Sequence, residues 1–303
     1  MAKSTALLNG SSGGRWDHPL NRLESGCYVT VMANGPWCGK WALVTGASSG
    51  IGAALAEELA AGGAHLVLTA RRARRLATLR AKLRAAHGVR IKVLAADLAQ
   101  PNTPAEIFAF TQERGIAVDL LVNNAGVGYY GEFRASDLER ELGIIHVNCS
   151  ALIHLTHLYL PGMVERQSGA ILIVSSTAAY QGVPYMATYA ASKGFDLLFA
   201  EALAREVEHY GVLVCALCPG PTASEFQKVA GVPDDLSMGL DPADRVAREG
   251  LRALAAGEHS VISGFTNWLG VEVQRVVPRR LVTSAAEMLF RPGHRREFRE
   301  TRS

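Results

Sequence analysis

The sequence has little of several features that mark other classes of protein. Charged residues make up 19% of the 303 residues and the formal net charge is only +3, so no basic field indicates a nucleic-acid partner. No run of eighteen apolar residues occurs, so we expect no membrane-spanning helix. The N-terminus lacks a basic segment followed by an apolar one, so no secretory signal is predicted.

Cysteine is scarce too, and its five residues are irregularly spaced, which is typical of reduced thiols in a cytoplasmic protein. Cys215 and Cys218 have the spacing of a metal or redox pair, but they fall in an apolar strand, where residues three apart face opposite sides. His146, His154 and His157 share a helix face that no acid or cysteine joins. We therefore predict no metal site.

The composition, 49% hydrophobic, is sufficient for one large domain with a substantial core. Residues 1–38 are rich in Gly, Ser and Asn and show no period, so we predict a disordered extension there. Met32 lies shortly before the first predicted strand, and a start at this residue is a hypothesis. We assign residues 39–264 to the main domain and residues 265–303 to a helical C-terminal extension that is part of this domain or packed on it.

Short apolar segments alternate with helical ones from residue 41 onward. Strands separated by helices of about ten residues or more predict right-handed βαβ units and a parallel sheet. The strands are continuous apolar runs, as expected where helices cover both faces. The fold class is therefore α/β, a doubly wound parallel sheet of about seven strands in a single domain, with strands expected near 41–45, 65–69, 91–95, 119–122, 170–174, 212–217 and 260–262.

A glycine-rich turn joins the first predicted strand to a helix. Glycine lets the backbone turn tightly and approach a phosphate, and the helix N-terminus offers free N–H groups and the positive end of a dipole. The spacing Gly-x-x-x-Gly-x-Gly in a strand–turn–helix unit predicts a dinucleotide site. The turn comprises Gly46, Ser48, Ser49, Gly50, Ile51 and Gly52.

The end of the second predicted strand decides between the two nicotinamide cofactors. An acid there would bind the adenosine ribose hydroxyls and repel a 2′-phosphate. The segment Thr69-Ala-Arg71-Arg72 has no acid and begins a cationic cluster. Because the guanidinium fork suits phosphate, Arg71 predicts NADP(H) rather than NAD(H). Arg74 and Arg75 are also consistent with an ordinary solvated helix start.

Tyr189 and Lys193 lie four residues apart in a segment whose composition predicts a helix. A phenol ordinarily loses its proton near pH ~10, and an adjacent ammonium lowers that pKa. The pair therefore has the chemistry of a general acid/base.

Together these motifs resemble the short-chain dehydrogenase/reductases, specifically an NADP-preferring bacterial-type branch. The resemblance covers about residues 40–260, and its motifs occur in the family's order. They are Thr45 with the glycine turn, Asp97-Leu98, Asn123-Asn124-Ala125-Gly126, Asn148, Ser176, Tyr189-x-x-x-Lys193 and Pro219-Gly220-Pro-Thr222.

The resemblance implies a Rossmann-type fold and a role for each matching residue. Tyr189 would exchange a proton with the substrate oxygen, and Lys193 would lower the pKa of Tyr189 and bind the nicotinamide ribose. Ser176, rather than the neighbouring Ser175, would hydrogen-bond the carbonyl oxygen, and Asn148 would hold a relay water. The cofactor would contact the glycine turn, Arg71, Asp97, Leu98, Asn124, Ala125, Gly126, Tyr189, Lys193, Pro219, Gly220 and Thr222.

The function predicted is NADP(H)-dependent interconversion of a ketone or aldehyde and an alcohol by hydride transfer. The alternative is a non-catalytic NADP(H)-binding regulatory protein on the same fold; an epimerase or dehydratase is a weaker third option. We expect a small hydrophobic substrate, with a pocket wall formed by Tyr129, Tyr130, Tyr185, Met186, Phe226 and the 223–240 loop. The resemblance also implies a homodimer or homotetramer that pairs the helices near 136–165 and 187–209.

The C-terminal extension combines positive charge with an amphipathic helix. Residues 275–303 contain eight arginines and three glutamates, a net charge of +5. A helix beginning after Pro278 would place Leu281, Val282, Ala285, Met288 and Leu289 on one face. This pattern is consistent with weak peripheral membrane contact by a cytoplasmic protein, and also with packing of the helix on the domain or on a second subunit.

Overall fold

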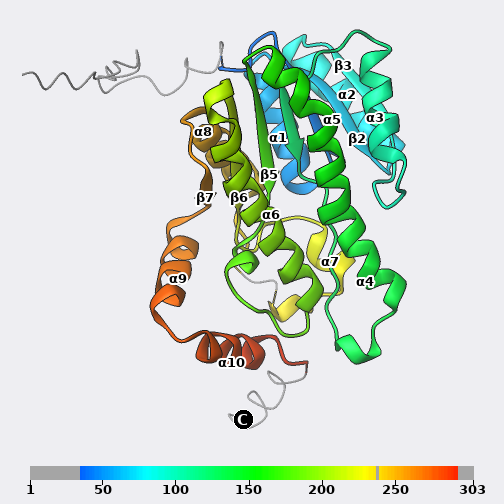
Figure 1. Cartoon of the computed structure of the whole chain (residues 1–303). Coiled ribbons are helices and arrows are strands. Elements are labelled where there is room, and N and C mark those ends of the chain that lie inside the picture. The colour runs from blue at the N-terminus through cyan, green and yellow to red at the C-terminus, as the bar shows by residue number, and fades with distance from the viewer. Residues whose placement is uncertain (1–34, 237–238, 293–303) are drawn as a thin grey trace, which may run out of the picture. The chain divides into compact units, whose positions relative to one another are not determined.

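The computed structural model describes residues 35–236 and 239–292 of the chain (Figure 1). Most of the predicted extension, residues 1–34, and the last eleven residues lie outside the described residues. The predicted extension ended at residue 38, but Trp37 is buried in the core and Cys38 N donates to Gly35 O at 2.9 Å in a turn. The boundary at residue 38 was therefore placed too late. Burial of the Trp37 side chain holds residues 35–38 against the domain, although the composition of the preceding segment is typical of disorder.

Seven parallel strands form one sheet in the order β3-β2-β1-β4-β5-β6-β7. The chain moves outward from β1 in one direction and then from β4 in the other, so the strand order reverses between β1 and β4. In such sheets the crevice beyond the carboxyl ends of these strands is where ligands bind. The strands are β1 (Trp41–Thr45), β2 (His65–Ala70), β3 (Ile91–Ala95), β4 (Leu120–Asn123), β5 (Gly169–Val174), β6 (Val212–Cys218) and β7 (Ser260–Ile262).

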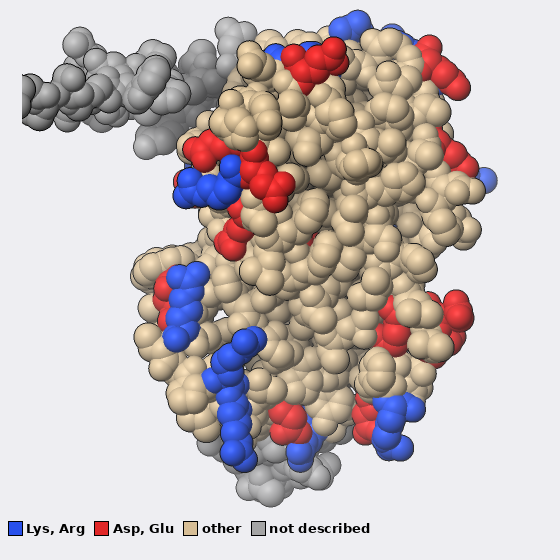
Figure 2. All heavy atoms as spheres, viewed as in Figure 1, with Lys and Arg blue, Asp and Glu red and all other residues tan. Residues whose placement is uncertain are grey.

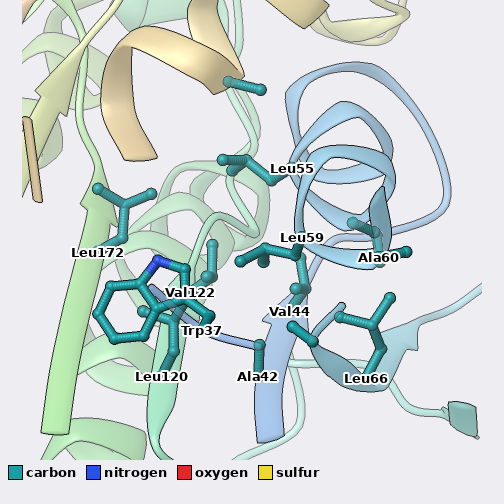
Figure 3. Packing of buried hydrophobic residues seen from close by; sticks show 14 of the residues in the cluster. Trp37, Ala42, Val44, Leu55, Leu59, Ala60, Leu66, Leu120, Val122 and Leu172 are labelled. Carbon is teal, nitrogen blue, oxygen red and sulfur yellow. The ribbon is translucent and has the colours of Figure 1, made fainter. Parts of the chain in front are cut away.

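Helices cover both faces of the sheet, which confirms the predicted doubly wound α/β fold. On one face the sheet is covered by α1 (Gly50–Ala61), α2 (Ala73–His87) and α8 (Ala243–Ala255), and Ala42 and Val44 of β1 share this layer with Leu55 and Leu59 of α1 (Figure 3). Leu43, one residue along, faces the opposite layer. That layer contains α3 (Thr103–Gln112), α5 (Ala151–Glu165) and α6 (Ala187–Val207).

The helix predicted over residues 136–165 is not a single regular helix. It consists of α4 (Leu138–Ile145), a π-helical turn η3 (His146–Ser150) and α5. A π-turn inserts an extra residue into the helical repeat and occurs often at functional sites. It places Asn148 in the buried interior, where the side chain is 1% exposed.

The last elements run along the end of the domain where the cavity opens. A short helix α7 (Phe226–Ala230) precedes α8, and α9 (Phe265–Val276) and α10 (Arg279–Phe290) follow β7 (Figure 1). Pro278 separates the last two helices, as the sequence predicts. Within the described residues, no helix is long and apolar enough to cross a membrane.

Candidate active site

A cavity of about 430 Å³ lies at the carboxyl ends of the strands, at the point where their order reverses. Its lining includes the whole glycine turn, Gly46 to Gly52 except Ala47, together with the segments that follow β2, β4, β5 and β6. Of the predicted site residues, Arg71, Asp97, Leu98, Asn124, Ala125, Gly126, Ser176, Tyr189, Lys193, Pro219, Gly220 and Thr222 all line it. Asn148 does not, since it lies behind the wall.

The glycine turn is held against the end of β4 by close backbone contacts. Gly46 has φ +64°, and a Cβ atom there would lie 2.8 Å from the Asn124 amide nitrogen. A Cβ atom on Gly52 would lie 2.6 Å from Gly46 O. Thr45 closes the arrangement, because its hydroxyl accepts hydrogen bonds from the backbone N–H groups of Asn124 at 2.9 Å and Ala125 at 3.0 Å. A side chain at either glycine would therefore collide with Asn124 or with the turn itself, so the turn needs glycine at both positions.

The cationic cluster beyond β2 is organised around an acid that the sequence analysis did not single out. Glu225 contacts Arg72 and Arg75, with 2.7 Å between its carboxylate and Arg75 Nη1. Arg72 also donates to the hydroxyls of Ser48 at 2.9 Å and Ser49 at 2.7 Å, so it bridges the glycine turn and Glu225. Hydrogen bonds from Arg75 and Arg72 lower the pKa of Glu225 to about 2. Arg71 lines the same part of the cavity and is exposed.

Tyr189 lies at the cavity wall near the start of α6. Its ring packs against Phe226 of α7, with ring centroids 5.0 Å apart. Ser176 directly follows the buried Ser175 after β5, and its hydroxyl interacts with the Tyr189 hydroxyl in the direction that lowers the pKa of Tyr189. Burial raises the pKa of Tyr189, while the Lys193 charge and the Ser176 hydrogen bond oppose that rise. The expected lowering by Lys193 is thus present but is outweighed by burial in this structure.

Lys193 lies one helical turn after Tyr189 and is 5% exposed. Its ammonium donates to Val174 O at 2.9 Å and to Asp196 Oδ2 at 2.8 Å. An ammonium has three donors, so the third is available to the cavity. Burial by itself would lower the Lys193 pKa, but the Asp196 carboxylate reverses this and raises it.

The two serines that follow β5 have different surroundings. Ser175 is 3% exposed and donates to the backbone carbonyl of Lys193 at 2.8 Å, so it anchors α6 to the sheet. Both serines line the cavity, but Ser176 is less buried, and its side chain accepts from Ala178 N at 3.1 Å. This difference favours Ser176 as the residue that contacts substrate.

Asn148 connects Val127, in the segment that follows β4, to the helix α6. Its Oδ1 accepts from Val127 N at 2.9 Å, and its Nδ2 donates to Val127 O at 3.0 Å and to Ser192 Oγ at 2.8 Å. Ser192 in turn donates to the backbone carbonyl of Tyr189 at 2.7 Å. The Asn148 side chain therefore positions the Tyr189 helix against the segment that lines the cavity.

The substrate end of the cavity differs in part from the predicted wall. Met186 and Phe226 line it, as expected, whereas Tyr129, Tyr130 and Tyr185 are absent from the lining. The three tyrosines were selected as aromatic loop residues, and their position along the chain did not show which way they face. The further apolar lining residues include Val183, Val229, Val232, Leu236 and Phe290.

Gly128 is another residue that sequence reasoning missed. A Cβ atom there would lie 2.7 Å from Phe226 and 3.1 Å from the Tyr189 ring. The absence of a side chain allows both rings to approach the strand end. No local sequence signal marked this position, because the contact is made by residues that are distant along the chain.

The chain is similar to proteins of one family across most of its length. The model of the family described as short chain dehydrogenase matches residues 40–232. The "Very-long-chain 3-oxoacyl-CoA reductase" of Bos taurus is 36% identical over 199 residues, which is 64% of this chain and 63% of that protein. This chain thus matches slightly less than two thirds of that relative's length.

Solved structures show the same similarity. A short-chain dehydrogenase from Sphingobium yanoikuyae in complex with NADPH superposes with a TM-score of 0.72 at 31% identity, covering 78% of this chain and 93% of that one. A short chain dehydrogenase/reductase from Burkholderia phymatum in complex with NAD gives a TM-score of 0.71 at 26% identity, covering 79% and 94%. The sheet order, the glycine turn and these similarities lead to one conclusion: the chain belongs to the short-chain dehydrogenase family of NAD(P)-dependent oxidoreductases.

Proposed function

We propose that this protein is an NADP(H)-dependent oxidoreductase that interconverts a hydrophobic ketone or aldehyde and the corresponding alcohol. The observation that carries the proposal is the convergence of Ser176, Tyr189 and Lys193 on a cavity that is continuous with the glycine turn. A non-catalytic regulatory protein would have no need to preserve a buried lysine beside a phenol and a serine. The complete set therefore favours the enzyme over the regulatory alternative.

The residues of the chain fit a dinucleotide at one end of the cavity. The glycine turn lines this end, where the free N–H groups at the start of α1 suit a pyrophosphate, and Arg71 and Arg72 line the part beyond β2, where a 2′-phosphate would bind. When bound, NADP(H) supplies or accepts the hydride. The NADPH complex of the Sphingobium protein supports this choice of cofactor, while the NAD complex of the Burkholderia protein keeps NAD(H) as the alternative to be tested.

The side chains at the other end perform the proton chemistry. Reduction of a carbonyl leaves negative charge on its oxygen, and preorganised donors at that oxygen stabilise the transition state by about 3 kcal/mol each. Ser176 donates a hydrogen bond and Tyr189 donates the proton; in alcohol oxidation Tyr189 accepts it. Lys193 places its positive charge beside Tyr189 and stabilises the phenolate. Asn148 and Ser192 hold the helix that carries both residues.

The substrate class follows from the cavity wall. Apolar side chains from several segments of the chain line the cavity near Tyr189, among them Val183, Met186, Phe226, Val232 and Phe290. Such a wall favours an aliphatic or ring-shaped hydrophobic carbonyl compound. A lipophilic ketone agrees with the name of the bovine relative, a very-long-chain 3-oxoacyl-CoA reductase.

We further propose a cytoplasmic homodimer or homotetramer with weak peripheral membrane contact. The helices α4, α5 and α6 expose apolar side chains although α5 and α6 also pack on the sheet, which is typical of a subunit contact. These exposed residues are Leu138, Leu142, Ile145, Ile153 and Leu198.

The test is a cofactor-oxidation screen over a panel of carbonyl compounds, with NADPH and NADH compared for each. The panel should contain aliphatic aldehydes, 2-ketones of increasing chain length, 3-oxoacyl thioesters and steroid ketones. We expect turnover with NADPH and a lipophilic carbonyl. The matched control is Tyr189→Phe, which should bind NADPH normally and turn over roughly 10²–10⁴-fold more slowly. NADPH binding without turnover of any panel member would favour the regulatory alternative.

A further inference from the structure

The helices α9 and α10 expose an unusual amount of apolar surface. Only Val271 of α9 and Ala286 of α10 are buried. On each helix the exposed apolar residues follow helical spacing, so each helix has one exposed apolar face. We call these two faces together the α9–α10 face. The α9–α10 face comprises Phe265, Trp268, Leu269, Val273, Val276, Leu281, Met288 and Leu289, with exposures from 45% to 84%. A patch of this kind on a protein surface marks an interaction site.

The α9–α10 face adjoins the substrate end of the cavity. Phe290, the last residue of α10, lines the cavity and packs with Val183 and Met186. Tyr130 Oη donates to Phe290 O at 2.6 Å, which holds the end of α10 at the wall. Thr283 on the same helix approaches Gly182, next to Val183. A partner bound to the α9–α10 face would therefore lie next to the substrate end of the cavity, which Phe290 lines.

Positive charge accompanies the apolar residues. Arg275, Arg279, Arg280 and Arg291 belong to or directly follow these two helices, and all are exposed. Arg275 pairs with Glu272 and Arg291 with Glu287, whereas Arg279 and Arg280 form no ion pair with other described residues. Figure 2 shows this part of the surface as mainly uncharged, with Lys or Arg side chains extending across it.

We propose that the α9–α10 face binds the surface of an anionic lipid bilayer, so that lipophilic substrate passes from the lipid into the cavity. Apolar side chains enter the boundary between headgroups and acyl chains, and arginines bind the anionic headgroups. Each arginine near such a surface strengthens binding about fivefold. A second copy of the chain is the less suitable occupant, because symmetric pairing of this face would place arginines of both copies against one another.

Membrane binding by the α9–α10 face does not depend on the proposed oxidoreductase activity, while delivery of a lipophilic substrate rests on it. The experiment therefore measures binding without any enzymatic activity. The full chain is mixed with vesicles of phosphatidylcholine containing anionic phosphatidylglycerol, and bound protein is separated by flotation. We expect binding at low salt that weakens at high salt, because the Debye length falls from about 10 Å at 0.1 M to about 3 Å at 1 M. Trp268 should report insertion by a blue shift of its fluorescence, which Trp268→Phe removes.

Two variants test the two parts of the surface. Leu281→Glu/Met288→Glu should reduce the vesicle-bound fraction at least tenfold, and Arg279→Gln/Arg280→Gln should reduce it roughly tenfold or more at low salt only. The control is Phe133→Glu, which places one negative charge at an apolar side chain that is 64% exposed and lies before α4. NADPH binding and thermal unfolding show that each variant folds.

Three results would overturn the proposal. The first is the absence of binding to anionic vesicles at low salt. The second is equal loss of binding in the Phe133→Glu control and in Leu281→Glu/Met288→Glu. In the third, Leu281→Glu/Met288→Glu sediments as a smaller species than the parent protein but binds vesicles as well as the parent does. That result would assign the α9–α10 face to a subunit contact.

Discussion

Lys193 and Asp196 form a buried ion pair within one turn of α6, with 2.8 Å between the ammonium nitrogen and Asp196 Oδ2. Lys193 is the cation that stabilises the Tyr189 phenolate, so its partner determines how much of that charge Tyr189 experiences. Burial is the main cause of the raised Tyr189 pKa, the Lys193 charge opposes it, and the Asp196 carboxylate adds to it. Asp196 therefore favours the protonated phenol, the form that donates to a carbonyl.

Replacing Asp196 with Asn should lower the pKa of Tyr189, because Asn keeps a hydrogen-bond acceptor but removes the negative charge. Alcohol oxidation requires the phenolate, so its rate should rise at a lower pH than in the parent protein. Carbonyl reduction requires the phenol, so its rate should decline earlier as pH rises. The pH profiles of both reactions are measured in the parent protein and in Asp196→Asn. A titration of tyrosinate absorbance in the cofactor-free proteins measures the change in the Tyr189 pKa independently of turnover.

The control for this titration is Cys149→Ser. Cys149 is the other buried titratable side chain that interacts with both Lys193 and Asp196, and burial raises the pKa of its thiol to about 11. We expect the control to leave both pH profiles in place. Profiles of Asp196→Asn that coincide with those of the parent would contradict a role for Asp196 in setting the Tyr189 protonation state.

Replacing Asp196 with Ala should destabilise the fold. Removing one partner of a buried pair leaves an uncompensated charge and costs about 3–5 kcal/mol in the free energy of unfolding. Asp196 is 1% exposed and Lys193 5%, so water reaches neither readily. Denaturant unfolding of Asp196→Ala and of the double variant Asp196→Ala/Lys193→Met provides the measurement. A double variant no more stable than the single one would mean that the unpaired ammonium is not the source of the loss.

Arg71→Ala should weaken NADPH binding about ten- to a hundredfold and leave NADH binding nearly unchanged. A guanidinium–phosphate contact contributes roughly 1.5–3 kcal/mol, and only NADPH has the 2′-phosphate. Arg72→Ala provides the comparison, since Arg72 bridges Ser48, Ser49 and Glu225 at the same edge of the cavity. If Arg71→Ala increased the dissociation constants of NADPH and NADH equally, the assignment of Arg71 to the 2′-phosphate would be refuted.

Glu225→Gln should strengthen NADPH binding without affecting NADH. Glu225 now occupies the forks of Arg72 and Arg75, so a 2′-phosphate must compete with an ionised carboxylate for them. The low pKa of Glu225, about 2, keeps this competitor charged at neutral pH. Asp244→Asn is a matched control, because Asp244 is an exposed acid paired with Arg248 on α8, outside the cavity lining. Weaker NADPH binding by Glu225→Gln would show that Glu225 orients the arginines instead of competing for them.

Ile153→Glu and Leu198→Glu should each reduce the oligomer to smaller species. The two side chains lie on α5 and α6, are 42% and 68% exposed, and would bring like charges together across a symmetric contact. Sedimentation at micromolar concentration compares them with the parent protein and with Phe133→Glu. A parent that already sediments as a monomer would remove the proposed pairing of these helices.

Much of this architecture is readable from local pattern. Apolar runs alternating with helical segments predict the parallel sheet because both properties depend on residues close together in sequence. The glycine turn is equally local: Gly46 adopts a φ of +64° and continues directly into α1. Tyr189 and Lys193 share a helix face because they are four residues apart, and the resemblance that these motifs carry led to the family.

The same local reasoning was wrong where a residue's direction depends on distant parts of the chain. Trp37 follows a Gly-rich segment, yet its indole is buried in the core (Figure 3). Residues 136–165 read as one helix, but a π-turn interrupts it at Asn148, whose amide bonds Val127 and Ser192. Tyr129 and Tyr185 were expected in the pocket wall and are not part of the cavity lining.

What the sequence by itself determined is therefore the fold class and the family, since both follow from spacing within single elements and from the order of the motifs; the catalytic side chains are proposed from the same motifs. The tertiary structure alone decided which charges meet. It placed Glu225 against the arginines that follow β2, closed the cavity with Phe290 and left the α9–α10 face exposed. The contacts of Glu225 with Arg72 and of Phe290 with Tyr130 join residues that are 153 and 160 positions apart, and only packing of the whole chain brings such residues together.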